Sequence, residues 1–171
     1  MKMFIHSLPI LALAALQMAT RASAFPSSAA QSQQLRQRDA PQAVSLIFEA
    51  GPAAYSLNIT ADGQEYFTNS DLSINAILAP DYNPNAYCTF TTASGGAVAF
   101  EPSLVQRPGI DEFPINELVV GPPQPIVSVT CDGFCLGVYG ECVDFQGQYT
   151  APCCNGFCAA TRCRPWNDGS A

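Results

Sequence analysis

The cysteines are distributed unevenly along this chain of 171 residues. Residues 41–130 contain one cysteine, Cys88, whereas residues 131–163 contain seven. A segment of about forty residues cannot bury enough apolar surface to fold alone, so it depends on cross-links. The distribution therefore predicts two modules, a domain over 41–131 with its own core and a disulfide-rich module over 132–166.

The N-terminal residues indicate the compartment. Lys2 precedes a short apolar run over 8–16, and Ala22-Ser23-Ala24 has the small-x-small pattern of a cleavage site. This pattern predicts a secretory signal peptide over 1–24, because the run is shorter than the ~20 residues that cross a bilayer. We expect a secreted, extracellular protein with oxidised cysteines and no membrane span.

The two ends of the remaining chain are expected to be disordered. Residues 25–40 are polar and low in complexity, which is typical of a disordered tail or a propeptide. Arg36-Gln37-Arg38 is either a processing site or a pair of solvated arginines. The short segment 167–171 is also interpreted as disordered.

The composition argues against catalysis and against anionic partners. Without residues 1–24 the chain has five arginines and fourteen acidic residues, a formal charge of 5 − 14 = −9, which disfavours nucleic acids and anionic membranes. His6 and Lys2 are the only residues of their types, so the mature chain lacks the usual bases and histidine ligands. We expect no enzyme, no cofactor and a monomer.

Carboxylates are the remaining candidates for chemistry. Asp111-Glu112 and the trio Asp132, Glu141 and Asp144 could form a glycosidase-type pair, and the trio could bind calcium. The trio lacks a calcium-loop signature, and solvated loop carboxylates are far more common than catalytic ones. We therefore interpret these side chains as solvated.

The domain over 41–131 has the pattern of an all-β fold. Short segments rich in β-branched and aromatic residues alternate with turn sequences, and no segment has a sustained helical stripe. Asp62-Gly63 lies between two alternating segments and predicts a hairpin. We expect a small β-sandwich or barrel followed by the disulfide-rich module. The expected strands cover 44–48, 54–60, 65–68, 74–78, 86–92, 97–100, 118–120 and 126–131.

Side-chain alternation places two of the cysteines. Cys88 shares a strand face with Phe90, and Cys131 shares one with Val127 and Val129. Both cysteines then lie on the apolar faces of their strands. This predicts a Cys88–Cys131 bridge inside the β-domain and leaves six cysteines for the C-terminal module.

The six remaining cysteines have the spacing C-x6-C-x10-C-C-x3-C-x4-C. The adjacent pair Cys153-Cys154, followed by Cys158, resembles the knottin or inhibitor cystine knot pattern of toxins, protease inhibitors and some fungal secreted proteins. Spacing alone allows fifteen connectivities. The resemblance implies the pairs Cys135–Cys154, Cys142–Cys158 and Cys153–Cys163. A zinc site is the disfavoured alternative, because the compartment is expected to be oxidising and the chain without residues 1–24 has no histidine.

Aromatic and basic side chains of the tail are the candidate binding residues. A cystine knot has almost no interior, so several rings are expected at its surface, where they either bind a partner or pack against the β-domain. Asn58-Ile59-Thr60 is a glycosylation sequon, and Asn58 is expected to point away from the core. The predicted binding residues are Tyr139, Phe145, Tyr149, Arg162, Arg164 and Trp166.

These features favour extracellular binding. The overall architecture resembles the small secreted cysteine-rich proteins of filamentous fungi, some of which act as effectors. That resemblance implies an effector-like or toxin-like ligand of an extracellular protein, such as a protease or a host receptor. The alternatives are a protease inhibitor presenting segment 136–141 or 143–152, and a polysaccharide-binding wall protein with Tyr139, Tyr149 and Trp166 as stacking platforms.

Overall fold

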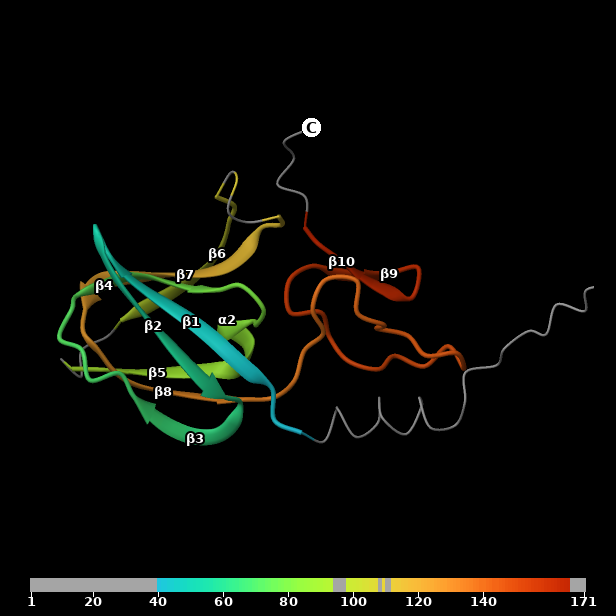
Figure 1. Cartoon of the computed structure of the whole chain (residues 1–171), viewed down its shortest axis with the longest axis horizontal. Helices are drawn as coiled ribbons and strands as arrows, with labels where there is room; N and C mark the ends of the chain where they lie inside the picture. The colour runs from blue at the N-terminus through green and yellow to red at the C-terminus, as the bar shows by residue number, and fades with distance from the viewer. Residues whose placement is uncertain (1–39, 94–97, 108, 110–111, 167–171) are drawn as a thin grey trace, which may run out of the picture.

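The computed structural model describes residues 40–93, 98–107, 109 and 112–166. The predicted signal peptide, nearly all of the segment 25–40 and the segment 167–171 lie outside these residues. Its regular secondary structure is almost all strand, as expected for an all-β chain (Figure 1). The elements are β1 (Ala43–Ala50), β2 (Ala53–Thr60), β3 (Asp62–Phe67), β4 (Ile74–Ala79), α2 (Pro84–Tyr87), β5 (Cys88–Thr92), β6 (Ala99–Val105), β7 (Ile115–Gln124), β8 (Ile126–Asp132), β9 (Phe157–Ala159) and β10 (Arg162–Arg164).

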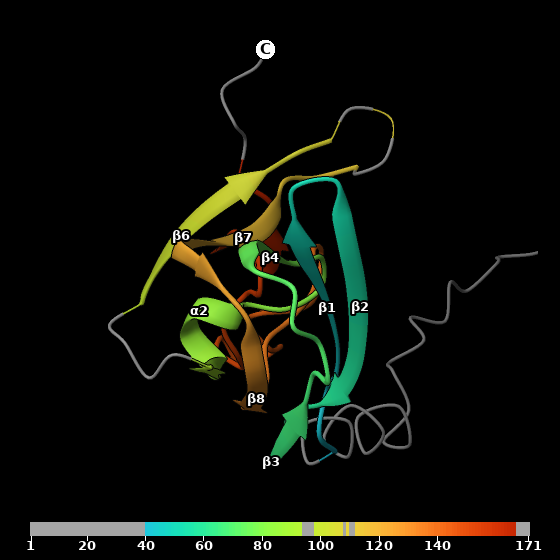
Figure 2. The same cartoon turned by 90° about the vertical axis from the view of Figure 1, so that its left-hand side faces the viewer.

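The first eight strands form two antiparallel sheets that pack face to face. One sheet has the order β2-β1-β4-β7-β6 and the other the order β3-β8-β5. Figure 2 shows the larger sheet, with β8 and β3 of the smaller sheet beside it. Alternation along β1 explains the packing, since Val44, Leu46 and Phe48 are buried and the residues between them are partly exposed. The fold is therefore the expected all-β domain, here a two-sheet sandwich.

An apolar core fills the space between the two sheets. Phe48 of β1 stacks on Tyr55 with ring centroids 4.8 Å apart and meets the edge of Phe90 from the smaller sheet at 6.4 Å. Edge-to-face pairs of this kind add to the free energy that burial alone provides. The fully buried members include Leu46, Phe48, Ile74, Ile77, Tyr82, Leu118, Ile126 and Val129.

The hairpin predicted at Asp62-Gly63 is wrong. β2 pairs with β1 in the larger sheet, whereas β3 pairs with β8 in the smaller one, so the two strands do not form a ladder with each other. Asp62 and Gly63 lie at the start of β3, where the register with β8 shifts. Gly63 has a φ of 74° and allows the chain to pass between the sheets.

The strand predicted over 86–92 begins two residues later. Ala86 and Tyr87 belong to α2, a single helical turn that Asn83 caps by accepting a hydrogen bond from the Ala86 amide at 3.2 Å. Pro84 occupies the first turn, where a missing amide hydrogen costs nothing. The capping residue and the proline outweigh the β propensity of the next residues.

Cys88 and Cys131 are cross-strand partners on β5 and β8 and form a disulfide. The predicted neighbour Val127 does not share their face, because it is exposed whereas Val129 and Cys131 are buried. The pairing of β5 with β8 shifts between Thr91 and Thr92, opposite this residue. A β-bulge there turns Val127 outward and interrupts the alternation that the sequence pattern assumed.

The cysteine-rich tail, residues 132–166, contains the other six cysteines. It forms the disulfides Cys135–Cys154, Cys142–Cys158 and Cys153–Cys163, the pairs that the resemblance to cystine-knot proteins implied. The Sγ atoms of Cys142, Cys153 and Cys163 lie within 4.8 Å of one another, so two of the bridges pack together. The tail therefore has a centre made of disulfides.

The tail ends in a small hairpin, β9–β10. Its two turn residues, Ala160 and Thr161, both have positive φ, as in a type I′ turn. The carbonyl of Thr161 accepts a hydrogen bond from the Cys142 amide at 3.0 Å, which fixes the turn against the first half of the tail. At Gly156 a Cβ atom would lie 1.8 Å from the Arg164 carbonyl oxygen, so only glycine allows the two segments to approach.

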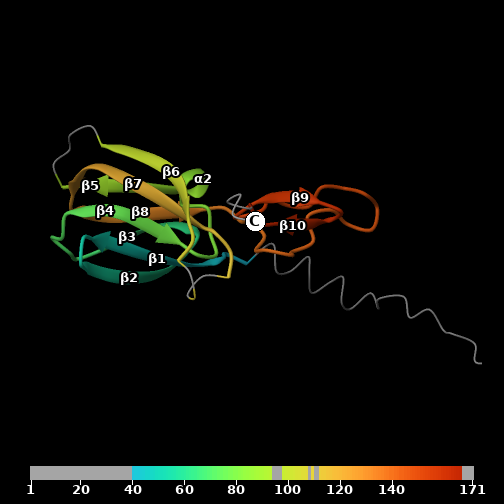
Figure 3. The same ribbon diagram turned by 90° about the horizontal axis from the view of Figure 1, so that it is seen from above.

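The tail contacts one end of the sandwich (Figure 3). Asn116 of β7 donates through Nδ2 to the carbonyl oxygens of Tyr82 at 2.8 Å and Cys154 at 2.9 Å. Gln42 accepts a hydrogen bond from the Cys135 amide at 3.0 Å. Cys135 and Cys154 are buried members of the sandwich core cluster. One disulfide of the tail therefore closes this end of the sandwich.

Tyr82 adds a third polar link at the junction. Its side chain is fully buried, and its hydroxyl donates to the Gly133 carbonyl at 3.1 Å. Burial, with smaller contributions from Tyr87 and Asp132, raises the pKa of Tyr82 to about 12. The phenol therefore stays protonated and keeps this hydrogen bond well above neutral pH.

Candidate functional site

The predicted binding residues of the tail fall into two groups. Tyr139, Arg162, Arg164 and Trp166 take part in contacts within the molecule. Phe145 and Tyr149 form no ring pair among the described residues, and 79% and 62% of their surfaces are exposed. The sequence pattern grouped all six together, whereas the structure separates rings that stabilise the tail from rings that face outward.

Tyr139 is the centre of the first group. Its ring meets the edge of Phe113 at 5.8 Å, and the Arg164 guanidinium lies 5.5 Å from the ring centroid. Arg162 donates to the Tyr139 carbonyl at 2.9 Å and forms a 3.0 Å ion pair with Glu141. These contacts hold Tyr139 in a left-handed conformation, with a φ of 65°, which a side chain of this size rarely adopts.

No sequence pattern singled out Phe113. It precedes β7 in the chain and lies far from the tail in sequence, so no local pattern connects it with Tyr139. Its ring contact joins a sandwich loop to the tail. The alternative in which rings of the tail pack against the β-domain therefore applies to Tyr139.

Residues 143–149 form a closed loop that we call the aromatic loop. Val143 and Tyr149 form a β-bridge at its base, and the Asp144 amide donates to the Gln148 carbonyl at 2.9 Å. The Asp144 carboxylate accepts hydrogen bonds from the amides of Gln146 and Gln148, both at 2.8 Å. Short loops with this many internal bonds lose little entropy on binding. The aromatic loop therefore presents Phe145 on an ordered backbone.

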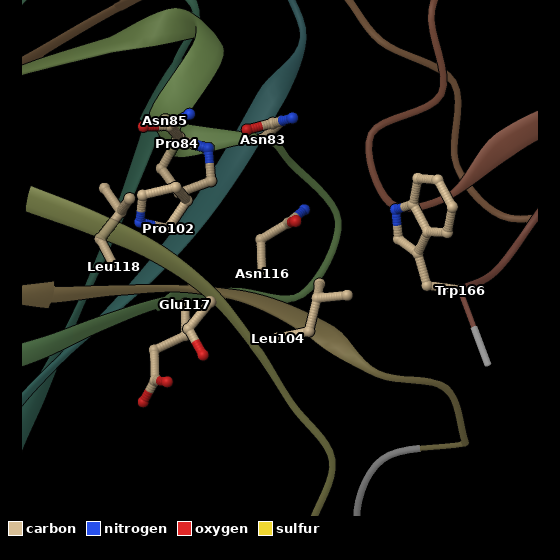
Figure 4. Close-up of a pocket in the computed structure, with 10 residues that line it drawn as sticks. Asn83, Pro84, Asn85, Pro102, Leu104, Asn116, Glu117, Leu118 and Trp166 are labelled. Atoms are coloured by element: carbon tan, nitrogen blue, oxygen red, sulfur yellow. The ribbon is translucent and has the colours of Figure 1, made fainter. Parts of the chain in front are cut away.

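Trp166 belongs to a different region, a shallow groove at the junction of the tail and the sandwich (Figure 4). Its indole packs at 5.2 Å from Phe157 and faces the sandwich across a cavity of about 380 Å³. In this view Asn116 lies between Trp166 and the helical turn α2, and Leu104 lies below Asn116. The described residues that line it are Asn83, Pro84, Asn85, Pro102, Ser103, Leu104, Asn116, Glu117, Leu118 and Trp166.

The sequence pattern also did not predict the sandwich residues that line the groove. They come from α2, β6 and β7, which no motif connects, and only the packing of the tail places Trp166 opposite them. The positions of Leu104 and Trp166 are notable because 43% and 46% of their surfaces are exposed. An exposed aliphatic side chain and an exposed indole at the same opening provide an apolar contact surface.

Two carboxylates of the candidate catalytic trio, Glu141 and Asp144, make contacts that stabilise the tail. Glu141 pairs with Arg162, and Asp144 accepts amides of its own loop. Asp132 is exposed at the end of β8. Asp111 lies outside the described residues, and Glu112 is exposed. Glu141 and Asp144 therefore make structural contacts in the tail, whereas Asp132 lies in a strand.

The cysteines offer no thiolate for a metal or for nucleophilic attack. All eight lie in the described part of the chain, and each is bonded to a partner. The cluster of Cys142, Cys153 and Cys163 sulfurs belongs to two disulfides. Zinc binds thiolate sulfur, so these bonded sulfurs do not form a zinc site.

Asn58 lies on β2, an edge strand of the larger sheet, and its side chain is exposed. Ile59 next to it is buried, as alternation predicts. An attached glycan would therefore extend from the sandwich without displacing core residues. The sequon and the tail lie in different modules.

Comparisons with known proteins add no family to this description. The chain matches no family model, no curated protein and no solved structure at a significant level. Among the described residues, no helix has both the length and the apolar character needed to cross a membrane. The function is therefore inferred from the site itself.

Proposed function

We propose that this protein is a secreted, non-catalytic ligand of an extracellular protein and that it binds through the aromatic loop. One observation carries the proposal: Phe145 is 79% exposed on a loop whose backbone is fixed by its own hydrogen bonds. Water contact with so large an apolar ring is unfavourable. Aromatic side chains that enter a partner pocket are typical energetic hot spots.

The disulfides support this proposal because they make the base of the loop rigid. Cys142 precedes the aromatic loop and is bonded to Cys158, while Cys153 and Cys154 follow it. The order of pairing is first to fourth, second to fifth and third to sixth within the tail. It is the order that the resemblance to cystine-knot proteins implied, and we include a knotted topology in the proposal. Preorganised loops bind with a smaller entropic cost than flexible ones.

Protease inhibition is the second candidate function. A single ordered loop, held by cross-links on both sides, is the form expected of an inhibitor segment, and the aromatic loop lies within the predicted segment 143–152. The stacking-platform alternative has less support. Tyr139 contacts Phe113 and Arg164, whereas Trp166 contacts Phe157, so these two rings belong to separate clusters.

The experiment compares two exposed phenylalanines. The full chain, secreted from a eukaryotic host, is immobilised to capture proteins from extracellular fluid, and it is also assayed against serine, cysteine and aspartic proteases. Phe145→Ala should weaken capture or inhibition about 30-fold, corresponding to about 2 kcal/mol for a hot-spot ring. Phe67→Ala is the matched control, since Phe67 lies on β3 of the sandwich and is 58% exposed.

The outcomes separate the possibilities. Inhibition of one protease class that is lost in Phe145→Ala would identify the protein as an inhibitor. Capture of a non-protease that is lost in the same variant would identify a ligand of another protein. Binding that depends on Phe67 and not on Phe145 would contradict the proposal and assign recognition to the sandwich.

Secretion and glycosylation form part of the same proposal. Four disulfides are typical of an extracellular protein. Exposed Asn58 has the sequon needed for a glycan. Expression in a eukaryotic host should give a protein in the medium whose mass falls after treatment with a glycosidase for N-linked glycans. Asn58→Gln should remove that difference, and a protein retained in the cells would contradict secretion.

A further inference from the structure

We infer that the groove between the tail and the sandwich binds a neutral oligosaccharide. It is a second site, distinct from the aromatic loop, and it exists only when the two modules are joined. Trp166 comes from the tail, whereas the rest of the lining comes from the sandwich. A cavity of about 380 Å³ is at the lower end of the range of small-ligand sites.

The two sides of the groove match the two kinds of surface on a sugar ring. A pyranose has an apolar face of C–H groups and an edge of hydroxyl groups. Trp166 and Leu104 provide exposed apolar surface, while Asn83, Asn85 and Ser103 provide amide and hydroxyl groups. Because each hydroxyl both donates and accepts, neutral amides and hydroxyls are suited to it.

Some polar side chains of the groove are free to bind a ligand, and others already have hydrogen-bond partners. Asn83 uses Oδ1 to cap α2, and its Nδ2 group has no acceptor among the described residues. Asn85 is exposed. Asn116 uses both hydrogens of Nδ2 on the carbonyls of Tyr82 and Cys154, so it is fixed in position. The groove therefore has a rigid floor and free amide groups at its rim.

The charges favour a neutral ligand. Among the described residues of the lining, Glu117 alone is charged, and its carboxylate points away from Trp166 (Figure 4). The part of the chain that the structure describes places no arginine in the lining to balance a phosphate or a sulfate. An anionic saccharide would therefore bring uncompensated charge to an acidic protein.

The strand that borders the groove disfavours an extended peptide. β6 is the edge of the larger sheet, and an added peptide strand would need its backbone donors and acceptors. Pro102 lies in the middle of β6 and has no amide hydrogen, which interrupts such a ladder. A saccharide needs no ladder and can use the side chains alone.

The test uses Trp166 as its own reporter, because it is the only tryptophan in the chain. The disulfide-bonded full chain is titrated with pentasaccharides of β-1,3-glucose, β-1,4-glucose, β-1,4-N-acetylglucosamine and α-mannose while tryptophan emission is recorded. At least one of them should give a saturable change. Leu104→Ala should weaken that binding about fivefold or more, because it removes apolar contact area.

Val119→Ala is the matched control, since Val119 on β7 is 42% exposed and does not line the groove. It should leave the titration unchanged, as should Phe145→Ala, because the aromatic loop is a separate site. Absence of any emission change at millimolar saccharide would overturn the inference. So would equal effects of Leu104→Ala and Val119→Ala, or a response only to sulfated saccharides or to a proline-rich peptide.

Discussion

The sandwich and the tail are ordered by different means. The sandwich buries large apolar side chains between two sheets and contains one disulfide, Cys88–Cys131. The tail has three disulfides within 35 residues, and its buried residues are mostly the cysteines themselves. In a small module the bridges occupy the interior, so large rings remain at the surface.

This difference determines in which module an exposed aromatic ring indicates a binding contact. In the sandwich, Phe48 and Tyr82 are fully buried because a core is available to them. In the tail, Tyr139 and Trp166 find partial partners, whereas Phe145 finds none among the described rings. Aromatic rings in the tail are therefore exposed partly because the module is small. Phe145 is a candidate contact because the loop that carries it is ordered.

The largest expected effect compares a core ring with a surface ring. Phe48→Ala should lower the free energy of unfolding by about 4 kcal/mol, because it removes a fully buried ring that joins the two sheets. Phe145→Ala should change it by less than about 0.5 kcal/mol. Chemical denaturation with the disulfides intact measures both, and a large loss in Phe145→Ala would show that this ring has an unrecognised stabilising partner.

A smaller effect is expected when one bridge of the tail is removed. Cys142→Ser combined with Cys158→Ser opens a bridge of sequence separation 16 and should cost about 3 kcal/mol. The loss should be confined to the tail, so amide exchange should accelerate over 136–164 and remain slow in β1, β4 and β7. Equal acceleration in both modules would contradict the comparison, because it would mean that the sandwich depends on that bridge.

The smallest effect concerns the polar link between the modules. Asn116→Ala leaves the carbonyls of Tyr82 and Cys154 without their donor and should cost about 2 kcal/mol. Asn75→Ala is the control, because the exposed Asn75 accepts a single hydrogen bond from the Gly51 amide and its loss should cost about 0.5 kcal/mol. Thermal unfolding measures both, and equal shifts would show that the junction does not depend on Asn116.

The candidate sites could be predicted only in part from the sequence. Phe145, Tyr149 and Trp166 stood out because rings are crowded in a segment too small to bury them. The separation of these rings into a loop and a groove was not predictable, because it depends on the contact of Trp166 with Phe157 and on its position across the groove from sandwich residues such as Leu104. Leu104 is remote from the tail in sequence, and periodicity reports only on neighbours in the same element, which Phe157 and Trp166 are not.

The sequence by itself determined the all-β class, the position of the cysteine-rich tail and the shared faces of Cys88 and Phe90 and of Cys131 and Val129. These features follow from side-chain alternation and from the number of cysteines, both of which are local properties. Only the tertiary structure decided that β2 and β3 belong to different sheets, that Val127 turns outward and that Ala160 and Thr161 adopt positive φ. Each of these depends on hydrogen bonds to a distant segment, such as the bond from the Cys142 amide to the Thr161 carbonyl. A distant backbone donor can hold a residue in a conformation that its own side chain disfavours, and no local pattern encodes that donor.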